Sequence, residues 1–128
     1  MSRELRYTKD HEWVKAEGKK ARMGITEYAQ KELGDVVYVE LPKEGRTVEQ
    51  SQAFITVESV KAASDVYAPV SGTVVGVNSN LQDQPELVNQ SPYEKGWMAV
   101  IEMSKPEELD SLMGAPEYEK HIGELKQS

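Results

Sequence analysis

Residues 53–67 read Ala53-Phe-Ile-Thr-Val-Glu-Ser-Val-Lys-Ala-Ala-Ser-Asp-Val-Tyr67 and predict a β-hairpin. In the first half of this segment, Ala53, Ile55 and Val57 fall on one face at a period of two, which is typical of a strand with one buried side. The pattern breaks around Lys61 and then resumes in a return strand. We therefore expect a hairpin with Lys61 in its turn.

Short runs of the same kind lie on both sides of this hairpin. The strands expected from them span residues 13–16, 21–25, 36–41, 47–48, 73–77 and 97–103. Many short strands at close spacing favour a small β-sandwich or barrel to which helices are added. The sequence therefore predicts a mainly β fold in a single domain covering residues 1–128.

The expected helices are short and lie mostly at the C-terminal end. One spans residues 27–33, with Thr26 as its N-cap and Gly34 placed to end it. Behind the last strand, a Ser-Lys-Pro-Glu capping box at residues 104–107 predicts the start of a further helix. We expect a helical extension over about residues 104–123.

Composition excludes several classes of protein. The chain has 128 residues, 15 basic and 22 acidic side chains, a formal net charge of -7 and no cysteine. A chain of this length can bury a core without disulfides, and without cysteine it has no disulfide framework, thiolate metal site or cysteine nucleophile. The acidic balance argues against nucleic acid or an anionic membrane as the main partner, because both select clustered Lys and Arg.

No segment reads as a membrane span or a targeting signal. No apolar run approaches the roughly 20 residues that a membrane helix needs. The N-terminal residues Met1-Ser-Arg-Glu-Leu-Arg6 contain neither an apolar core nor an Arg/Ser-rich presequence. We expect a cytoplasmic protein, or a mitochondrial one only if a presequence has been removed.

Residues suited to catalysis or metal binding are scarce. His11 and His121 are the only histidines, and no second histidine stands at a ligand spacing from either. The sequence has no phosphate-binding loop and no Gly-x-Ser-x-Gly elbow. With 22 acidic residues, clustering of carboxylates carries no signal. We therefore expect a protein that is not an enzyme and that holds no metal.

Lys61 differs from the other lysines in its surroundings. Val60 precedes it and two alanines follow it, where a turn more often holds Asn, Asp or Gly. The simplest interpretation is a solvated turn residue. However, a lone amine at the tip of a rigid hairpin, with small neighbours that do not obstruct it, also suits covalent attachment of a cofactor arm by a ligase. The residues by themselves leave both interpretations open.

The segment Glu58-Ser-Val-Lys-Ala-Ala-Ser-Asp-Val-Tyr-Ala-Pro-Val-Ser-Gly72 resembles the lipoyl-lysine segment of the H proteins of glycine cleavage systems. Four more segments resemble H-protein segments in the same order: Tyr7-Thr-Lys-Asp-His-Glu-Trp-Val14, Gly24-Ile-Thr-Glu-Tyr-Ala-Gln30, Leu33-Gly-Asp-Val-Val-Tyr-Val-Glu-Leu-Pro42 and Leu87-Val-Asn-Gln-Ser-Pro-Tyr-Glu-Lys-Gly-Trp-Met98. The resemblance covers roughly Leu5 to Tyr118. Each motif alone is moderately specific, and five in order are very specific.

This resemblance implies a lipoyl-domain-like β-sandwich, or barrel-sandwich hybrid, with lipoate in amide linkage to Lys61. It implies a non-catalytic, monomeric carrier that serves three enzymes. Glycine decarboxylase (P protein) loads an aminomethyl group onto the lipoyl sulfur, and a tetrahydrofolate-dependent aminomethyltransferase (T protein) removes it. Dihydrolipoyl dehydrogenase (L protein) then reoxidises the dithiol with NAD. A lipoylating enzyme is the fourth implied partner.

The resemblance also assigns roles to other residues. Glu58 and Gly72 match positions that the lipoylating enzyme requires in this family. Glu58 would offer that enzyme a charged handle. Gly72 would allow a backbone shape that other residues do not tolerate, which is equally the property of a plain turn glycine.

Glu12 and Asp65 match acidic residues that hold the aminomethyl-lipoyl arm in a cleft. Carboxylates there would attract the cationic amine of the arm, although each residue can also be an ordinary solvated carboxylate. Asp10 matches less well, because some relatives carry serine before His-Glu-Trp. We expect four aromatic residues to belong to the core rather than the site: Trp13, Tyr38, Phe54 and Trp97.

Three alternatives compete with this interpretation. Lipoyl domains of 2-oxoacid dehydrogenases usually have Asp before the lysine and lack the terminal extensions, whereas Val60 stands here. Biotin carriers have methionine on both sides of the lysine. The third alternative, an H-like protein acting as a structural or lipoate-relay module outside glycine cleavage, stays open on sequence alone.

Overall fold

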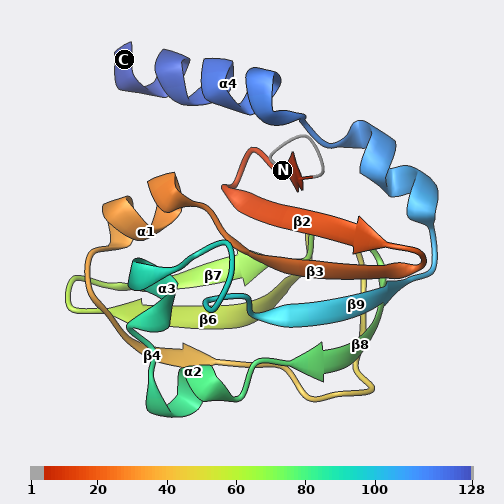
Figure 1. Cartoon of the computed structure of the whole chain (residues 1–128), viewed down its shortest axis with the longest axis horizontal. Helices are drawn as coiled ribbons and strands as arrows, with labels where there is room; N and C mark the ends of the chain where they lie inside the picture. The colour runs from red at the N-terminus through yellow and green to blue at the C-terminus, as the bar shows by residue number, and fades with distance from the viewer. Residues whose placement is uncertain (1–4, 128) are drawn as a thin grey trace.

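The computed structural model describes residues 5–127 and shows two antiparallel sheets with a common core (Figure 1). Residues 1–4 and 128, at the two ends of the expected domain, lie outside the described residues. The six-stranded sheet has the order β1-β2-β3-β9-β8-β5, and the three-stranded sheet has the order β4-β6-β7. The strands are β1 (Leu5–Tyr7), β2 (Glu12–Glu17), β3 (Lys20–Ile25), β4 (Val36–Glu40), β5 (Thr47–Val48), β6 (Ala53–Ser59), β7 (Ala63–Tyr67), β8 (Gly72–Val77) and β9 (Ala99–Met103).

The core forms where the inward faces of the two sheets meet. Met23 and Ile101 of the larger sheet join Val39, Ile55 and Val57 of the smaller one in a single buried cluster. The alternation that the sequence shows over residues 53–57 thus marks an inward face in the strand's second half, where Ile55 and Val57 are buried. The prediction of a mainly β sandwich is confirmed.

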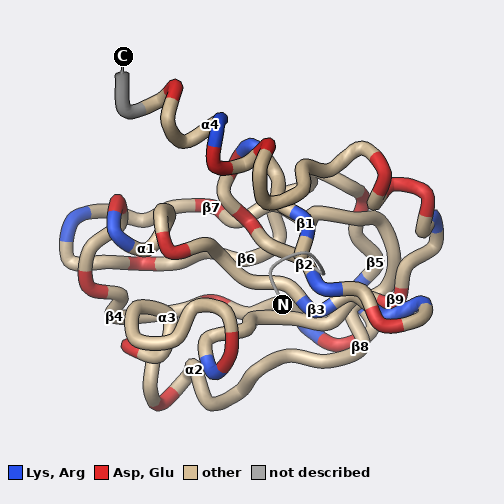
Figure 2. The backbone as a smooth tube through the Cα atoms, turned by 45° about the horizontal axis from the view of Figure 1, so that its top comes forward, with Lys and Arg blue, Asp and Glu red and all other residues tan. Residues whose placement is uncertain are grey.

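Helices occupy the connections and the C-terminal end. They are α1 (Glu27–Leu33), α2 (Asn80–Asp83), α3 (Leu87–Gln90), a 3-10 helix (Pro106–Ser111) and α4 (Ala115–Gln127). Both acidic and basic residues lie along α4 (Figure 2). The prediction for α1 is confirmed, because the Thr26 hydroxyl accepts a hydrogen bond from the Ala29 N–H and Gly34 follows the last turn with φ of 81°. None of the described helices has the length and apolar character of a membrane span.

The prediction of a capping box at residues 104–107 is wrong. Lys105, not Ser104, precedes the 3-10 helix, and no side chain caps it. Lys105 stands before Pro106, which disfavours helical backbone at the preceding residue, and it has φ of -136° and ψ of 77°. The Ser104 N–H instead donates to the carbonyl of Ser71, in the turn before β8.

Three of the four aromatic residues expected in the core differ little from that expectation. Trp13 and Phe54 are buried, and Trp97 is half-buried beneath the Arg22 guanidinium. Tyr38 contradicts the expectation, because 43% of it is exposed. A register shift between Val36 and Tyr38 is the cause: it places Val36 and Val39 inward and turns Tyr38 outward.

The β6–β7 hairpin spans the length of the smaller sheet. In Figure 1 its connection lies at the left end of the molecule beside α1, whereas β8 begins at the opposite end. Across the hairpin, Ala63 pairs with Glu58 and Asp65 pairs with Thr56. The hairpin tip and the start of β8 are therefore separate places in the fold.

Candidate functional site

The turn that carries Lys61 is held by hydrogen bonds from four backbone N–H groups. The Ser59 N–H donates to the Ala62 carbonyl at 2.8 Å, and the Ser59 hydroxyl accepts from the N–H groups of Lys61 and Ala62 at 3.2 Å each. The Val60 N–H donates to the Asp35 carbonyl at 3.0 Å, which ties the turn to the segment after α1. The tip is therefore fixed although its side chains are exposed.

The Lys61 side chain leaves this turn into solvent. Its Cε lies 3.2 Å from the position that a Cβ would take on Gly34, so the stem of the lysine passes close to the end of α1. No carboxylate of the described residues is recorded in an ion pair with its ammonium group. Val60, beside it, is 67% exposed. A ligase can thus reach the amine without displacing a partner, and the site fits an amide-linked cofactor arm.

Glu58 lies on β6 at the base of the same turn. It is exposed and pairs with Tyr38 of β4 on one side and Ala63 of β7 on the other. The structure therefore brings Glu58 and Lys61 to the same end of the molecule.

Gly72 lies elsewhere, at the start of β8 between Val48 of β5 and Met103 of β9. A Cβ on Gly72 would overlap the carbonyl oxygen of Glu102 and come within 2.9 Å of the Ile101 side chain. Close packing between β8 and β9 therefore requires glycine at this position, independently of any recognition by a lipoylating enzyme.

Glu12 is buried, with only 2% of the residue exposed. Its Oε1 accepts from the Thr8 hydroxyl at 2.6 Å and its Oε2 accepts from the Tyr67 N–H at 3.1 Å. Burial raises the pKa of Glu12 to about 7, although the two hydrogen bonds oppose the rise; the nearby Asp10 carboxylate adds to it. The interpretation of Glu12 as a solvated surface carboxylate is therefore wrong.

A cleft of about 400 Å³ opens beside Glu12. Asp10 and Tyr67 are among the residues that line it, and the Asp10 N–H donates to the Thr8 hydroxyl oxygen. Thr8 thus links the two acidic residues, a role that the sequence motifs did not indicate. Hydroxyl side chains in short polar loops often bond to nearby backbone groups. The position of Thr8 in such a loop is the one feature of the sequence that could have indicated its role.

Asp65 does not line this cleft. It is exposed on β7, where the Thr56 hydroxyl approaches it at a long 3.5 Å. It precedes Tyr67 by two residues, which places the two on the same face of the strand, roughly 7 Å apart. The structure therefore brings Asp10 and Glu12 together, with Asp65 between them and the hairpin tip.

The described residues contain no group of three acidic or histidine side chains that could hold a metal ion. His11 instead contacts aromatic residues: its Nδ1 lies 2.8 Å from the Tyr118 hydroxyl, and its ring is 5.8 Å from that of His121. Burial, together with His121, lowers the pKa of His11. Both histidines thus join α4 to the body of the protein.

Comparison with known proteins shows which family the chain belongs to. A model of the glycine cleavage H-protein family matches residues 5–125. The chain belongs to the glycine cleavage H-protein family. The glycine cleavage system H protein of Brevibacillus brevis is 58% identical over 120 residues, covering 94% of this chain and 95% of that protein. That of Bacillus subtilis is 56% identical over 120 residues, covering 94% of each.

The fold agrees with this family. The crystal structure of a glycine cleavage system H protein from Mycobacterium marinum superposes with a TM-score of 0.86 at 37% identity, covering 94% of this chain and 98% of that one. The lipoyl-domain-like sandwich expected from the sequence is thereby confirmed.

Proposed function

We propose that this member of the H-protein family is the lipoyl carrier of a glycine cleavage system. Lipoate is attached to Lys61 and carries the aminomethyl group from glycine decarboxylase to the aminomethyltransferase. Dihydrolipoyl dehydrogenase then reoxidises the carrier. The chain itself is not a catalyst, and it acts as a monomer in the cytoplasm.

The observation that carries this proposal is the fixed, exposed turn at Lys61. Hydrogen bonds to Ser59 and Asp35 hold its backbone, and the described residues leave its ammonium group without an ion pair. A fixed backbone presents the amine to the ligase in one conformation, which lowers the entropic cost of recognition. The alanine that follows Lys61 leaves room for the active site of an approaching enzyme.

When bound, lipoate supplies a disulfide that accepts the aminomethyl group and a dithiol that is later reoxidised. The chain contributes no thiol of its own, because it has no cysteine, so no protein sulfur competes in exchange with the lipoyl dithiol.

Other residues of the chain have supporting roles in the proposal. Glu58 beside the turn is a charged contact for the lipoylating enzyme. Gly72 is needed for lipoylation indirectly, because only glycine lets β8 pack against β9 and so maintains the fold. Glu12 attracts the cationic amine of the arm in the cleft. Asp65 attracts it between the hairpin tip and the cleft, and Asp10 is a weaker contact. A carboxylate partly shielded from water binds an ammonium group more strongly than an exposed one does.

Intact-mass analysis tests the proposal directly. Protein from lipoate-replete cells that contain an active ligase should carry the lipoyl mass, and peptide mapping should place it on Lys61. An unmodified Lys61 under these conditions would contradict the carrier function.

A second measurement separates glycine cleavage from lipoate relay. The lipoylated protein, mixed with purified glycine decarboxylase, aminomethyltransferase and dihydrolipoyl dehydrogenase in the presence of tetrahydrofolate and NAD, should support glycine-dependent reduction of NAD. A fully lipoylated protein that supports no turnover would favour the relay module instead.

A further inference from the structure

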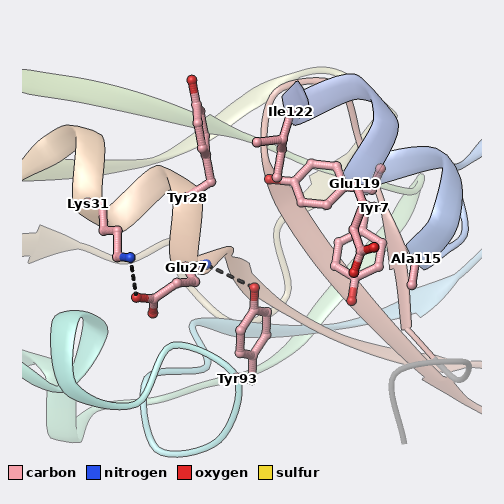
Figure 3. A pocket seen from close by; sticks show the side chains of 9 residues that line it. Tyr7, Glu27, Tyr28, Lys31, Tyr93, Ala115, Glu119 and Ile122 are labelled. Atoms are coloured by element: carbon pink, nitrogen blue, oxygen red, sulfur yellow. Dashed lines mark hydrogen bonds and ion pairs between the residues drawn. The ribbon is translucent and has the colours of Figure 1, made fainter. Parts of the chain in front are cut away.

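A second cavity, of about 290 Å³, lies between α1, α4 and the loop before β9. It shares only Tyr7 with the cleft beside Glu12. Figure 3 shows Glu27 and Tyr93 on one side of the cavity and Tyr7 and Glu119 on the other. We refer to this cavity as the tyrosine pocket.

Aromatic rings from distant parts of the chain make up its walls. Tyr7 of β1 stacks on Tyr118 of α4 with ring centroids 4.6 Å apart and planes within 5°. Tyr93 is fixed on the opposite side, because its hydroxyl accepts from the Glu27 N–H at 2.9 Å. Tyr28 of α1 completes the set of four tyrosines. A tyrosine ring that lines a pocket attracts a cation over the face that no other ring covers.

The charged groups around the pocket are mostly negative. Glu27 and Glu119 contribute carboxylates, and no hydrogen bond or ion pair to the Glu119 carboxylate is recorded among the described residues. Lys31 is the only basic residue in the lining; it is 70% exposed and pairs with Glu27 at 3.7 Å. A second cation can therefore enter beside Glu119.

Burial and the nearby carboxylates keep the tyrosine hydroxyls of the pocket protonated. Burial raises the pKa of Tyr7, and Tyr93 and Glu119 raise it further. Burial also raises the pKa of Tyr93, to which the Glu27 carboxylate contributes although the Glu27 N–H opposes it. Both hydroxyls are therefore neutral at physiological pH, and the Glu27 and Glu119 carboxylates are the groups that attract a cation to the pocket.

We propose that the tyrosine pocket receives the cationic side chain of an arginine or lysine from a partner enzyme that acts on Lys61. This proposal rests on the carrier function proposed above. The pocket and the Lys61 turn flank the same helix. Glu27, Tyr28 and Lys31 of α1 line the pocket, and Gly34, which follows the helix, lies beside the Lys61 stem. An enzyme that covers the hairpin tip therefore also reaches the pocket. The net charge of -7 favours a basic partner surface.

Binding of a single side chain can be measured on the full chain by nuclear magnetic resonance. The probe is N-acetyl-arginine methylamide, and its uncharged control is the citrulline analogue of the same shape. The arginine probe should shift the resonances of Tyr7, Tyr93 and Tyr118 in a saturable manner, with a dissociation constant in the millimolar range. Equal shifts with the citrulline analogue would overturn the assignment to a cation.

Matched variants localise the effect. Glu119→Gln should weaken binding of the arginine probe about threefold or more. Glu124→Gln, which removes the same charge from an exposed position on the same helix outside the lining, should leave binding unchanged. Equal weakening by both variants would show attraction to the acidic surface as a whole and would overturn the proposal.

The aromatic contribution has its own pair of variants. Tyr93→Phe retains a ring and should retain most of the probe affinity, whereas Tyr93→Leu should lose it. A Tyr93→Leu protein that keeps its fold and binds the probe normally would contradict a role for the ring.

Kinetics with the partner enzymes test the docking role. Lipoylated Glu119→Gln should raise the apparent KM of at least one partner enzyme for the carrier about threefold with an unchanged kcat, while Glu124→Gln should not. Unchanged KM values with all three partners would overturn the docking role. If the unsubstituted protein is not lipoylated or supports no turnover, the carrier function has failed, and the probe titration then still reports on the pocket.

Discussion

The two ends of the β6–β7 hairpin differ in nearly every physical property. At the tip, Lys61 and Val60 are exposed, and only the backbone is held in place. At the other end, Tyr67 donates to a buried carboxylate, and the chain continues through a buried turn into β8. The tip leaves its side chains free for chemistry, whereas the base uses its groups for packing and hydrogen bonding.

This difference shows that residues of one sequence motif can have either a functional or a structural role. Lys61 and Gly72 belong to one sequence motif, but the first stands where almost any side chain would fit and the second where only glycine fits. Substitutions should therefore separate function from stability along this single segment.

Lys61→Arg should have the largest functional effect, a complete loss of lipoylation and of carrier activity. Arginine keeps the charge, but its guanidinium cannot form the amide because it stays protonated. The free energy of unfolding should change by less than about 0.5 kcal/mol, because the side chain is exposed. Intact mass and urea denaturation measure the two effects. Lys43→Arg, in an exposed turn, serves as control and should be lipoylated normally on Lys61.

Gly72→Ala should have the largest effect on stability. Its Cβ would overlap the Glu102 carbonyl in the neighbouring strand, and we expect a loss of about 4 kcal/mol in the free energy of unfolding. Gly123→Ala, on α4 with nothing within 4 Å of the added Cβ, should instead stabilise the protein by about 0.5–1 kcal/mol. Urea denaturation distinguishes them. A fully stable Gly72→Ala protein that is not lipoylated would show direct recognition of this residue by the ligase.

Glu12→Gln should change how stability depends on pH. The folded pKa of about 7 lies above the ordinary value of 4.5, so the folded state binds more protons between these values. The contribution of Glu12 to stability is therefore fully present below pH 4.5 and is lost as the pH rises to about 7, by about 3 kcal/mol. The variant should lack this decline.

Urea denaturation between pH 4 and 8 measures that difference. Glu17→Gln, an exposed position on the same strand, is the matched control for loss of one carboxylate. Parallel stability profiles of the unsubstituted protein and Glu12→Gln would show that Glu12 ionises as readily in the fold as outside it.

Asp65→Asn should have the smallest effect. Water screens this exposed carboxylate, and its one recorded contact, with Thr56, is long, so stability should change by less than about 0.5 kcal/mol. If Asp65 attracts the aminomethyl-lipoyl arm, the carried group should hydrolyse faster in this variant, but less so than in Glu12→Gln. Release of formaldehyde and ammonia from the loaded carrier measures this. A larger effect at Asp65 than at Glu12 would place the arm along β7 rather than in the Glu12 cleft.

The sequence predicted α1, with its Thr26 cap, and the hairpin around Lys61, because both depend on contacts between close neighbours in the chain. It failed where distant segments decide the outcome. Tyr38 points outward because of a register shift between β4 and β6. The capping box failed for a local reason instead: Pro106 disfavours helical backbone at Lys105, so the 3-10 helix begins after that residue.

The amino-acid sequence by itself determined the family and the strand pattern and singled out Lys61 as the candidate attachment site, because motifs, turn chemistry and hydrophobic period are local properties. Only the tertiary structure decided that Glu12 is buried and titrates near neutrality, since its environment comes from Thr8 and from Tyr67 on the other sheet. Only the tertiary structure joined four tyrosines in one pocket. Desolvation and convergence of side chains depend on which segments meet in space, and no local pattern in the chain encodes that.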